Sequence, residues 1–179
     1  MSKRWILKPL FPVFLFLILV SLLHWQLKLS LLFFWLGAFL GSFLLSLDQV
    51  IYCYFQAPHE FTSQRIRRLL QLKRYQEALI LLVQTGDERS KLVFHSIFFQ
   101  VILLVVSFFV LTSSASLLGK GLVMGIFFQS LLEQGKDLKE KGQIDGWFWQ
   151  FQGPPEKNLQ VFYFVLMVLV FIFFTLFLI

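Results

Sequence analysis

The sequence is short of charge, cysteine and recognisable catalytic motifs, and each shortage excludes a class of protein. Only 15% of the 179 residues are charged, whereas a soluble domain carries about 25%. The single cysteine, Cys53, excludes an intramolecular disulfide framework and leaves no cysteine cluster for zinc. No Walker loop, Rossmann glycine pattern, HExxH helix or GxSxG elbow occurs, so we lean against an enzyme and expect no organic cofactor.

Transport and nucleic-acid binding also lack support in the sequence. There are neither inverted repeats nor two broken hydrophobic segments in matching positions, as a monomeric transporter would need. The net charge of +6 is not accompanied by a nucleic-acid recognition module, so no nucleic-acid partner is expected. In an apolar chain such a basic balance usually reports orientation or contact with anionic headgroups.

Apolar side chains are what the sequence has in abundance. Hydrophobic residues make up 58% of the chain, and 24 residues are phenylalanine. Because a membrane-spanning helix needs about 20 apolar residues, the chain can supply five or six spans with short loops and no second folded domain. The composition therefore predicts an all-α fold, a polytopic transmembrane helical bundle that forms one integral membrane domain over residues 1–179.

Uncharged runs place five spans and two larger loops. The spans are predicted at about residues 9–27, 29–55, 92–111, 117–133 and 159–179, with loops at 56–91 and 134–158. The first apolar run is followed by His24 and Trp25 and not by the small residues that signal peptidase requires. We therefore expect an uncleaved anchor.

The basic residues predict the orientation of these spans. Fourteen of the sixteen lysines and arginines fall on one side, which leaves Lys28 and Lys120 on the other. Cytoplasmic loops carry the excess of positive charge, so the N-terminus and both larger loops are predicted in the cytoplasm and the C-terminus outside. This pattern is typical of a small protein of the bacterial inner membrane.

The two loops have different expected roles. After Pro58, apolar residues such as Ile66 and Leu70 recur at helical spacing, with arginines on the opposite face. This pattern predicts a cytoplasmic amphipathic helix or hairpin that lies on anionic lipid; packing on the chain's own spans and docking of a partner protein are the alternatives. In the second loop, Trp147 and Trp149 are predicted to be interface anchors.

Five polar residues lie at membrane depth, where such groups are costly and are candidates for function. Asp48 ends the second predicted span, His95 begins the third, Gln100 lies further into it, and Gln129 and Glu133 end the fourth. Gln129 and Glu133 share one helical face because they are four residues apart. All except Gln100 fall at similar depth, so the sequence supports the hypothesis of a polar cluster at the cytoplasmic leaflet.

The order of these residues resembles that of a known family. Asp48, then His95 followed by Ser96, then Gln129 and Glu133, is similar to the motif order of the YdjM-like inner-membrane predicted metal-dependent hydrolases. The resemblance implies a divalent-metal or hydrolase-type site at the cytoplasmic leaflet. It implies Asp48, His95 and Glu133 as metal ligands, with Gln129 as a supporting or substitute group.

The chain departs from the pattern of that family at three positions. Gln49 and Gln129 stand where the family has histidines, and Glu133 stands where it has an aspartate. Neutral amides are poor ligands for transition metals, which prefer imidazole, thiolate and carboxylate. A fold shared with the family therefore does not by itself imply a shared metal site.

Structural roles compete with the metal site for the same residues. Gln100 and Gln129 are interhelical candidates, because amides within spans can link neighbouring helices by hydrogen bonds. Gly37 with Gly41, and Gly121 with Gly125, have the spacing of small residues four apart that allows close helix approach.

Function is therefore predicted only as a class with two alternatives. The first expectation is an integral membrane protein that acts through contacts with lipid, with a partner protein or with copies of itself. The alternatives are the YdjM-like site and an oligomeric channel or carrier, which would need Gln100, Gln129 or His95 to face a wet lumen.

Overall fold

The structure, a computed structural model, describes Ile18 and residues 31–85, 92–113, 115–151 and 153–178. These residues form helices and short connections and contain no strand, so the all-α prediction is confirmed for this part of the chain. The first predicted span, residues 9–27, lies outside the described residues apart from Ile18.

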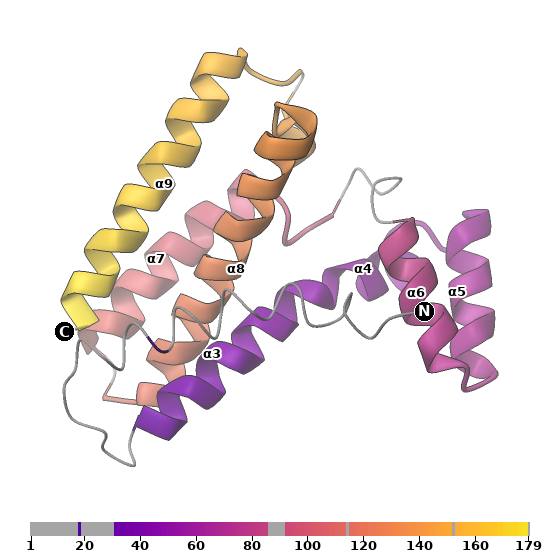
Figure 1. Cartoon of the computed structure of the whole chain (residues 1–179), viewed down its shortest axis with the longest axis horizontal. Helices are drawn as coiled ribbons and strands as arrows, with labels where there is room; N and C mark the ends of the chain where they lie inside the picture. Colours follow the sequence, from indigo (N-terminus) through magenta and orange to yellow (C-terminus); the bar gives the residue numbers. More distant parts are fainter. Residues whose placement is uncertain (1–17, 19–30, 86–91, 114, 152, 179) are drawn as a thin grey trace.

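Four long helices, α3 (Leu31–Ser46), α7 (Ile97–Ser113), α8 (Leu117–Lys141) and α9 (Lys157–Leu178), form what we call the four-helix body. They alternate in direction along the chain (Figure 1). At one end of the body α3 and α8 finish and α7 and α9 begin. We call it the basic end, because every described lysine and arginine except Lys120 belongs to it or to the segments that project from it.

The predicted second span, residues 29–55, is not one regular helix. After α3 the chain turns at Leu47, continues as α4 (Asp48–Ile51), and then widens into the π-helix η1 (Tyr52–Gln56). The side chain of Asp48 is fully buried. The irregular stretch therefore begins at the point where the Asp48 carboxylate is buried inside the basic end.

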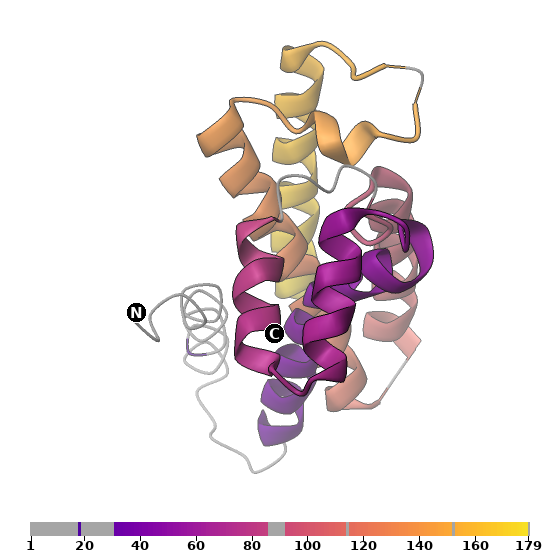
Figure 2. The same cartoon turned by 90° about the vertical axis from the view of Figure 1, so that its right-hand side faces the viewer.

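Two shorter helices project from this irregular stretch as a hairpin. They are α5 (Phe61–Gln71) and α6 (Tyr75–Gln84), which lie side by side at the basic end (Figure 2). Lys73, in the turn between them, has a left-handed backbone (φ 57°). The amphipathic pattern is thus realised as two helices, one of the two forms that the sequence predicted.

Buried apolar residues attach the hairpin to the rest of the molecule. Ile66 of α5 and Leu82 of α6 pack against Tyr52, Cys53 and Leu92. The hydroxyl of Tyr52 also donates a hydrogen bond to the carboxylate of Glu60 (2.9 Å), just before α5 begins. The hairpin therefore rests on the chain segments that leave and re-enter the four-helix body.

Glycines set the closest helix contact, which is between α3 and α8. A Cβ atom added to Gly121 would stand 2.1 Å from the carbonyl oxygen of Phe34, and one added to Gly125 would stand 2.3 Å from that of Ala38. In return, a Cβ atom on Gly37 would meet the carbonyl oxygen of Leu118 at 2.1 Å. The two glycine pairs predicted to allow close approach, Gly37 with Gly41 and Gly121 with Gly125, thus face each other.

The helix α8 has clear start and stop signals. The Ser116 side chain accepts a hydrogen bond from the backbone N–H of Gly119 (3.3 Å), and Gly142 ends the helix in the left-handed conformation (φ 70°). The helix continues past Glu133, where the fourth span was predicted to end, through a stretch in which Lys136, Lys139 and Glu140 are good helix formers. Part of the predicted second loop is therefore helical.

Among the described residues, two helical stretches are long and apolar enough to cross a membrane, Leu31–Gln56 and Lys157–Phe177. The helix α7, Ile97–Ser113, is apolar but shorter. Two of the five predicted spans thus meet this length and composition. The number of five spans therefore stays a prediction.

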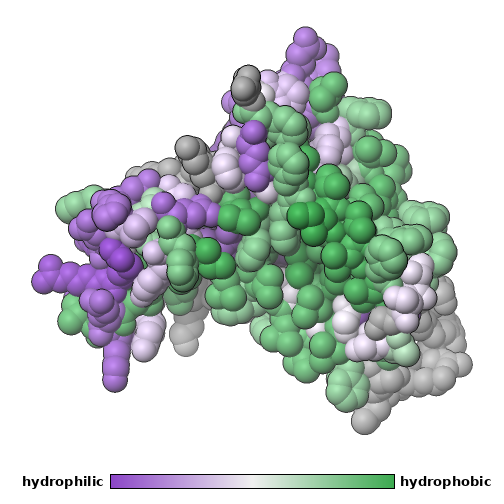
Figure 3. Space-filling model, turned by 180° about the vertical axis from the view of Figure 1, so that it is seen from behind, coloured by the Kyte–Doolittle hydropathy of each residue, from purple (hydrophilic) through white to green (hydrophobic). Residues whose placement is uncertain are grey.

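The outer surface of the four-helix body is largely apolar. Large side chains that point outward from α3, α7 and α9 include Phe43, Phe109 and Phe162, which are between 58% and 67% exposed. Figure 3 shows this apolar surface as a continuous green area, with hydrophilic residues gathered on the hairpin and near the turn from α8 to α9. The polar parts of the molecule therefore occupy the basic end.

Candidate functional site

A buried polar network lies inside the basic end and begins with Asp48. The Asp48 carboxylate accepts hydrogen bonds from the backbone N–H groups of Val93 (3.2 Å), Phe94 (2.7 Å) and His95 (3.3 Å). The same carboxylate lies 3.0 Å from Nδ1 of His95. One side chain at the start of α4 thus fixes the backbone that leads into α7.

His95 links this carboxylate to α8. Its Nε2 atom contacts a carboxylate oxygen of Glu133, and Gln129, four residues earlier on α8, donates a hydrogen bond to the other oxygen (2.8 Å). The four residues singled out at similar depth therefore form one connected chain, Asp48–His95–Glu133–Gln129. We call it the carboxylate–histidine chain.

Gln100, on α7, is the centre of a second group of hydrogen bonds. Its carbonyl oxygen accepts from Gln134 (2.9 Å) on α8 and from the hydroxyl of Tyr163 (2.7 Å) on α9, and its amide donates to Ser130 (2.6 Å). Gln100, Ser130 and Gln134 are almost completely buried. This group, which we call the amide hub, joins three helices of the body at one residue.

An aromatic segment covers the carboxylate–histidine chain. The 3-10 helix η3 (Asp145–Phe148) places the ring of Trp147 with its centroid 5.2 Å from that of His95. The indole N–H of Trp147 donates to Asp137 (2.9 Å), and that of Trp149 donates to the carbonyl of Leu92 (3.1 Å). The cover is therefore held to α8 and to the segment that leads into α7.

Gln160, near the start of α9, fixes the position of η3. Its side-chain oxygen accepts from the backbone N–H of Ile144 (2.7 Å), and its amide donates to Asp145 (2.6 Å) and to the carbonyl of Pro155 (2.8 Å). Gln160 is buried, so its side chain supplies the hydrogen bonds that the Ile144 N–H and the Pro155 carbonyl would otherwise make to water.

The prediction that the tryptophans are interface anchors is wrong for Trp147. Only 2% of its surface is exposed, because the loop folds inward and the ring packs on His95. Trp149 is half-buried and is hydrogen-bonded within the protein. The loop conformation that turns both rings inward depends on Gln160, which is distant from them in sequence.

Hydrogen-bond chemistry restricts what the carboxylate–histidine chain can do. A neutral imidazole carries one N–H, but both ring nitrogens of His95 face carboxylate oxygens. For both contacts to be hydrogen bonds, His95 and the two carboxylates must together share one proton more than a neutral imidazole carries. Because both nitrogens are engaged, His95 presents no free lone pair to a substrate or a metal ion.

The residues implied as metal ligands, Asp48, His95 and Glu133, do come together, but as a line of hydrogen bonds. Within the described ranges, no group of three or more histidine, cysteine, aspartate or glutamate side chains is arranged to hold a metal ion. The imidazole lies between the two carboxylates and separates them. Metal binding would require His95 to leave at least one of these partners.

Several members of the network were missed at the sequence level. Ser130, Gln134, Tyr163 and Gln160 were not singled out, and Trp147 was assigned to the surface. Gln134 follows Glu133 directly and lies four residues after Ser130, so the helical spacing that linked Gln129 to Glu133 could also have found this pair. Tyr163 offers no such local signal.

Comparison with known proteins adds no family to this geometry. Neither a family model, nor a curated protein, nor a solved structure matches the chain.

Proposed function

We propose that this chain is an integral membrane protein that acts by binding lipid or another protein, and not by catalysis. The observation that supports this most directly is the exposed apolar surface of α3, α7 and α9. On α9 alone, Phe162, Leu169 and Leu176 are each more than half exposed. Monomeric soluble proteins rarely expose a contiguous apolar patch larger than a few hundred Å², whereas in a bilayer such side chains face acyl chains.

In this proposal the five spans are the segment 9–27 together with the four helices of the body. The basic end lies in the cytoplasm of a bacterial cell, at the inner membrane, and the opposite end of the body lies outside. The distribution of charge supports this orientation, because Lys120 is the one described basic residue that belongs to the opposite end.

The hairpin of α5 and α6 then lies at the cytoplasmic surface. It carries five basic residues on a small surface, and apolar side chains such as Phe61 (82% exposed) and Tyr75 (57% exposed) point away from its core. Basic and apolar groups on one element are the combination that binds anionic headgroups. Lipid headgroups are therefore the first expected partner of the hairpin, and a partner protein is the second.

Membrane extraction and site-directed labelling test this proposal. In a Cys53→Ala background, single cysteines are introduced at Gln71 in the hairpin and at Ala115 before α8, both of which are exposed. After expression in a bacterium, the protein should stay in the membrane pellet at alkaline pH. A membrane-impermeant maleimide should label Ala115→Cys from outside the spheroplast, and Gln71→Cys only in inverted vesicles.

The cysteine-free parent controls for non-specific labelling. Release of the protein into the alkaline supernatant would overturn the integral membrane assignment. Labelling of both cysteines from the same side would overturn the topology and leave membrane insertion intact.

A second candidate function is a YdjM-like site for a divalent metal, supported by the convergence of Asp48, His95 and Glu133. Metal content of the purified protein tests it by comparison of the wild type with Asp48→Ala, His95→Ala and Glu133→Ala. Stoichiometric metal in the wild type that is lost in all three variants would favour this candidate. Glu140→Ala, an exposed carboxylate on the same helix, is the control that should keep the metal.

The oligomeric channel receives no comparable support. Gln100 and Gln129 are buried and are hydrogen-bonded to neighbouring side chains. Ion flux in liposomes that is absent from a Gln100→Leu variant would favour the channel over the other candidates.

A further inference from the structure

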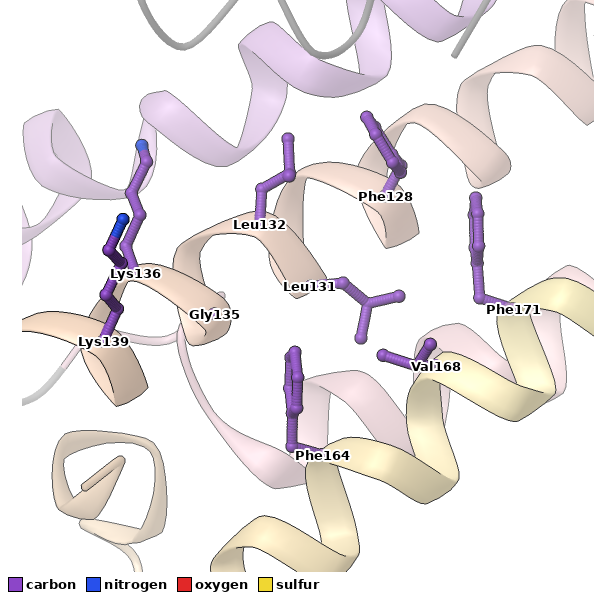
Figure 4. Close-up of a pocket in the computed structure, with 9 residues that line it drawn as sticks. All are labelled: Phe128, Leu131, Leu132, Gly135, Lys136, Lys139, Phe164, Val168 and Phe171. Carbon is purple, nitrogen blue, oxygen red and sulfur yellow. The ribbon is translucent and has the colours of Figure 1, made fainter. Parts of the chain in front are cut away.

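A groove of about 400 Å³ lies between α8 and α9 on the outside of the four-helix body (Figure 4). Its walls are apolar: Phe128, Leu131 and Leu132 contribute from α8, and Phe164, Val168 and Phe171 from α9. Lys136 and Lys139 line the same groove from the next turns of α8, toward the basic end. The lining of the groove is thus almost entirely apolar, and at one end the two lysines contribute their methylene stems, which lead to ammonium groups beside the groove.

The two lysines are available to an anion. Both side chains are exposed, and neither forms an ion pair within 4.0 Å of a described carboxylate; Lys136 has a longer-range electrostatic interaction with Glu133. The nearby Lys141, in contrast, pairs with Asp137 (3.0 Å). With a helical rise of about 1.5 Å per residue, Lys139 lies roughly 10 Å beyond Leu132 along α8.

Gly135 helps to form the groove between the apolar and the basic part. A Cβ atom at this position would stand 3.6 Å from the ring of Phe164, which is an ordinary van der Waals contact and not a clash. The absence of a side chain at Gly135 therefore leaves open space in the groove. Here glycine therefore shapes the groove, whereas Gly121 and Gly125 allow a helix contact.

We propose that this groove binds one anionic phospholipid, with its phosphate between Lys136 and Lys139 and an acyl chain along the apolar walls. This inference rests on the proposed function, because it places the groove in a bilayer with the lysines at the cytoplasmic leaflet. The order of groups along the groove, apolar and then basic toward the membrane surface, matches the order of tail and phosphate in the lipid.

Charge argues for a lipid over two other occupants. A second copy packed in parallel would bring its own Lys136 and Lys139 to the same depth, so that like charges would meet. The apolar segment of this chain between Lys8 and Lys28 contains no acidic residue that could pair with the lysines. An anionic phospholipid satisfies both parts of the groove at once.

Native mass spectrometry of the purified full chain in detergent tests this proposal. The protein is titrated with dioleoyl phosphatidylglycerol or dioleoyl phosphatidylcholine, and the apparent Kd of the first bound lipid is measured. A basic residue near an anionic headgroup contributes roughly fivefold in affinity, the equivalent of about 1 kcal/mol. We expect wild-type protein to bind phosphatidylglycerol at least tenfold more tightly than phosphatidylcholine.

Two variants separate charge from shape. Lys136→Gln with Lys139→Gln should reduce the preference for phosphatidylglycerol to within about twofold, while Gly135→Leu, which fills the groove and keeps the lysines, should weaken binding of both lipids. The matched control is Lys120→Gln with Lys157→Gln. It removes the same charge outside the groove and should leave the preference unchanged.

Each other outcome overturns the proposal. If both double variants lose the preference for phosphatidylglycerol equally, and Gly135→Leu binds like the wild type, the lipid is bound by overall charge and not by the groove. A dimer that Gly135→Leu abolishes, without a lipid preference, would assign the groove to a second copy. If the protein stays in alkaline-washed membranes but does not prefer phosphatidylglycerol, only the lipid site is overturned. If the protein is released from those membranes, the proposed function itself is overturned.

Discussion

Helix α8 contacts its neighbours in two different ways. Against α3 it places Gly121 and Gly125 directly on the α3 backbone. Carbonyl oxygens of α3 occupy the space that side chains at these two positions would need. Against α7 and α9 it places Ser130 and Gln134, which reach the backbone of neither helix and bond to the side chains of Gln100 and, through it, Tyr163.

The comparison shows how geometry sets tolerance to change. Backbone atoms cannot move aside, so the glycine contact accepts no added atom. Side chains can rotate and can find other partners, so each hydrogen bond between helices contributes modestly, on average about 0.6 kcal/mol in a membrane protein. We therefore expect the two faces of α8 to respond very differently to small substitutions.

The largest effect is expected for Gly121→Ala. Its Cβ atom would stand 2.1 Å from the carbonyl oxygen of Phe34, so α3 and α8 must separate and the folded state should be lost. The measurement is unfolding in mixed micelles with increasing dodecyl sulfate, followed by circular dichroism. Gly119→Ala is the matched control, since its nearest contact would be 3.7 Å and the change should stay within about 1 kcal/mol. Equal stability of the two variants would contradict this account of the α3–α8 contact.

The second effect concerns Asp48→Ala, which tests a polar contact that does involve backbone. Removal of this buried carboxylate leaves three N–H groups and the His95 ring without their acceptor, at a cost of about 3 to 5 kcal/mol. The same detergent titration measures it, and Glu140→Ala, an exposed carboxylate, is the control. A loss below about 1 kcal/mol would show that the backbone before α7 does not depend on Asp48.

The third effect is the loss of the amide hub in Gln100→Leu. Three hydrogen bonds disappear while apolar volume is kept, so unfolding should become easier by about 2 kcal/mol. Ser107→Ala on the same helix removes a buried hydroxyl that has no hydrogen-bond partner among the described residues, and should be neutral or stabilising. If both variants unfold like the wild type, the hub does not hold the helices together.

The smallest effect is expected for Tyr163→Phe, which removes one bond of the hub. We expect a loss of about 0.6 kcal/mol in the wild type and none in the Gln100→Leu background, because the acceptor is already gone. A double-mutant cycle of unfolding free energies measures this coupling. Equal losses in both backgrounds would mean that the Tyr163 hydroxyl acts elsewhere.

The glycine contact was accessible from the sequence because its signal is local. Two glycines four residues apart mark a helix that can approach another, and both α3 and α8 carry such a pair. The helix α9 was also predicted closely, since a continuous apolar run follows Pro154 and Pro155. Patterns within one helix thus predicted this element and the capacity of α3 and α8 for close approach, but not that the two helices would be each other's neighbour.

The parts that failed depend on which helices are neighbours. The break at Leu47 has no local cause in composition; it accompanies the turn that brings Asp48 to the backbone before α7. Likewise, depth along the spans singled out Gln100 and Gln129, but not Tyr163, whose role follows from the position of α9 beside α7. Burial of Trp147 required knowledge of the loop fold.

The bonds from Asp48 to residues 93–95 also have a consequence for the hairpin between them. The chain leaves the four-helix body just after Asp48 and returns at Val93, so both junctions are fastened at one carboxylate. The segment between them is a closed excursion whose length matters little to the rest of the chain, because closing a longer loop costs only a small additional entropy. We therefore expect that a different α-hairpin or a reporter domain can be grafted between these junctions without a change in the arrangement of the four-helix body, provided that the graft covers Tyr52, Cys53 and Leu92 as the native hairpin does.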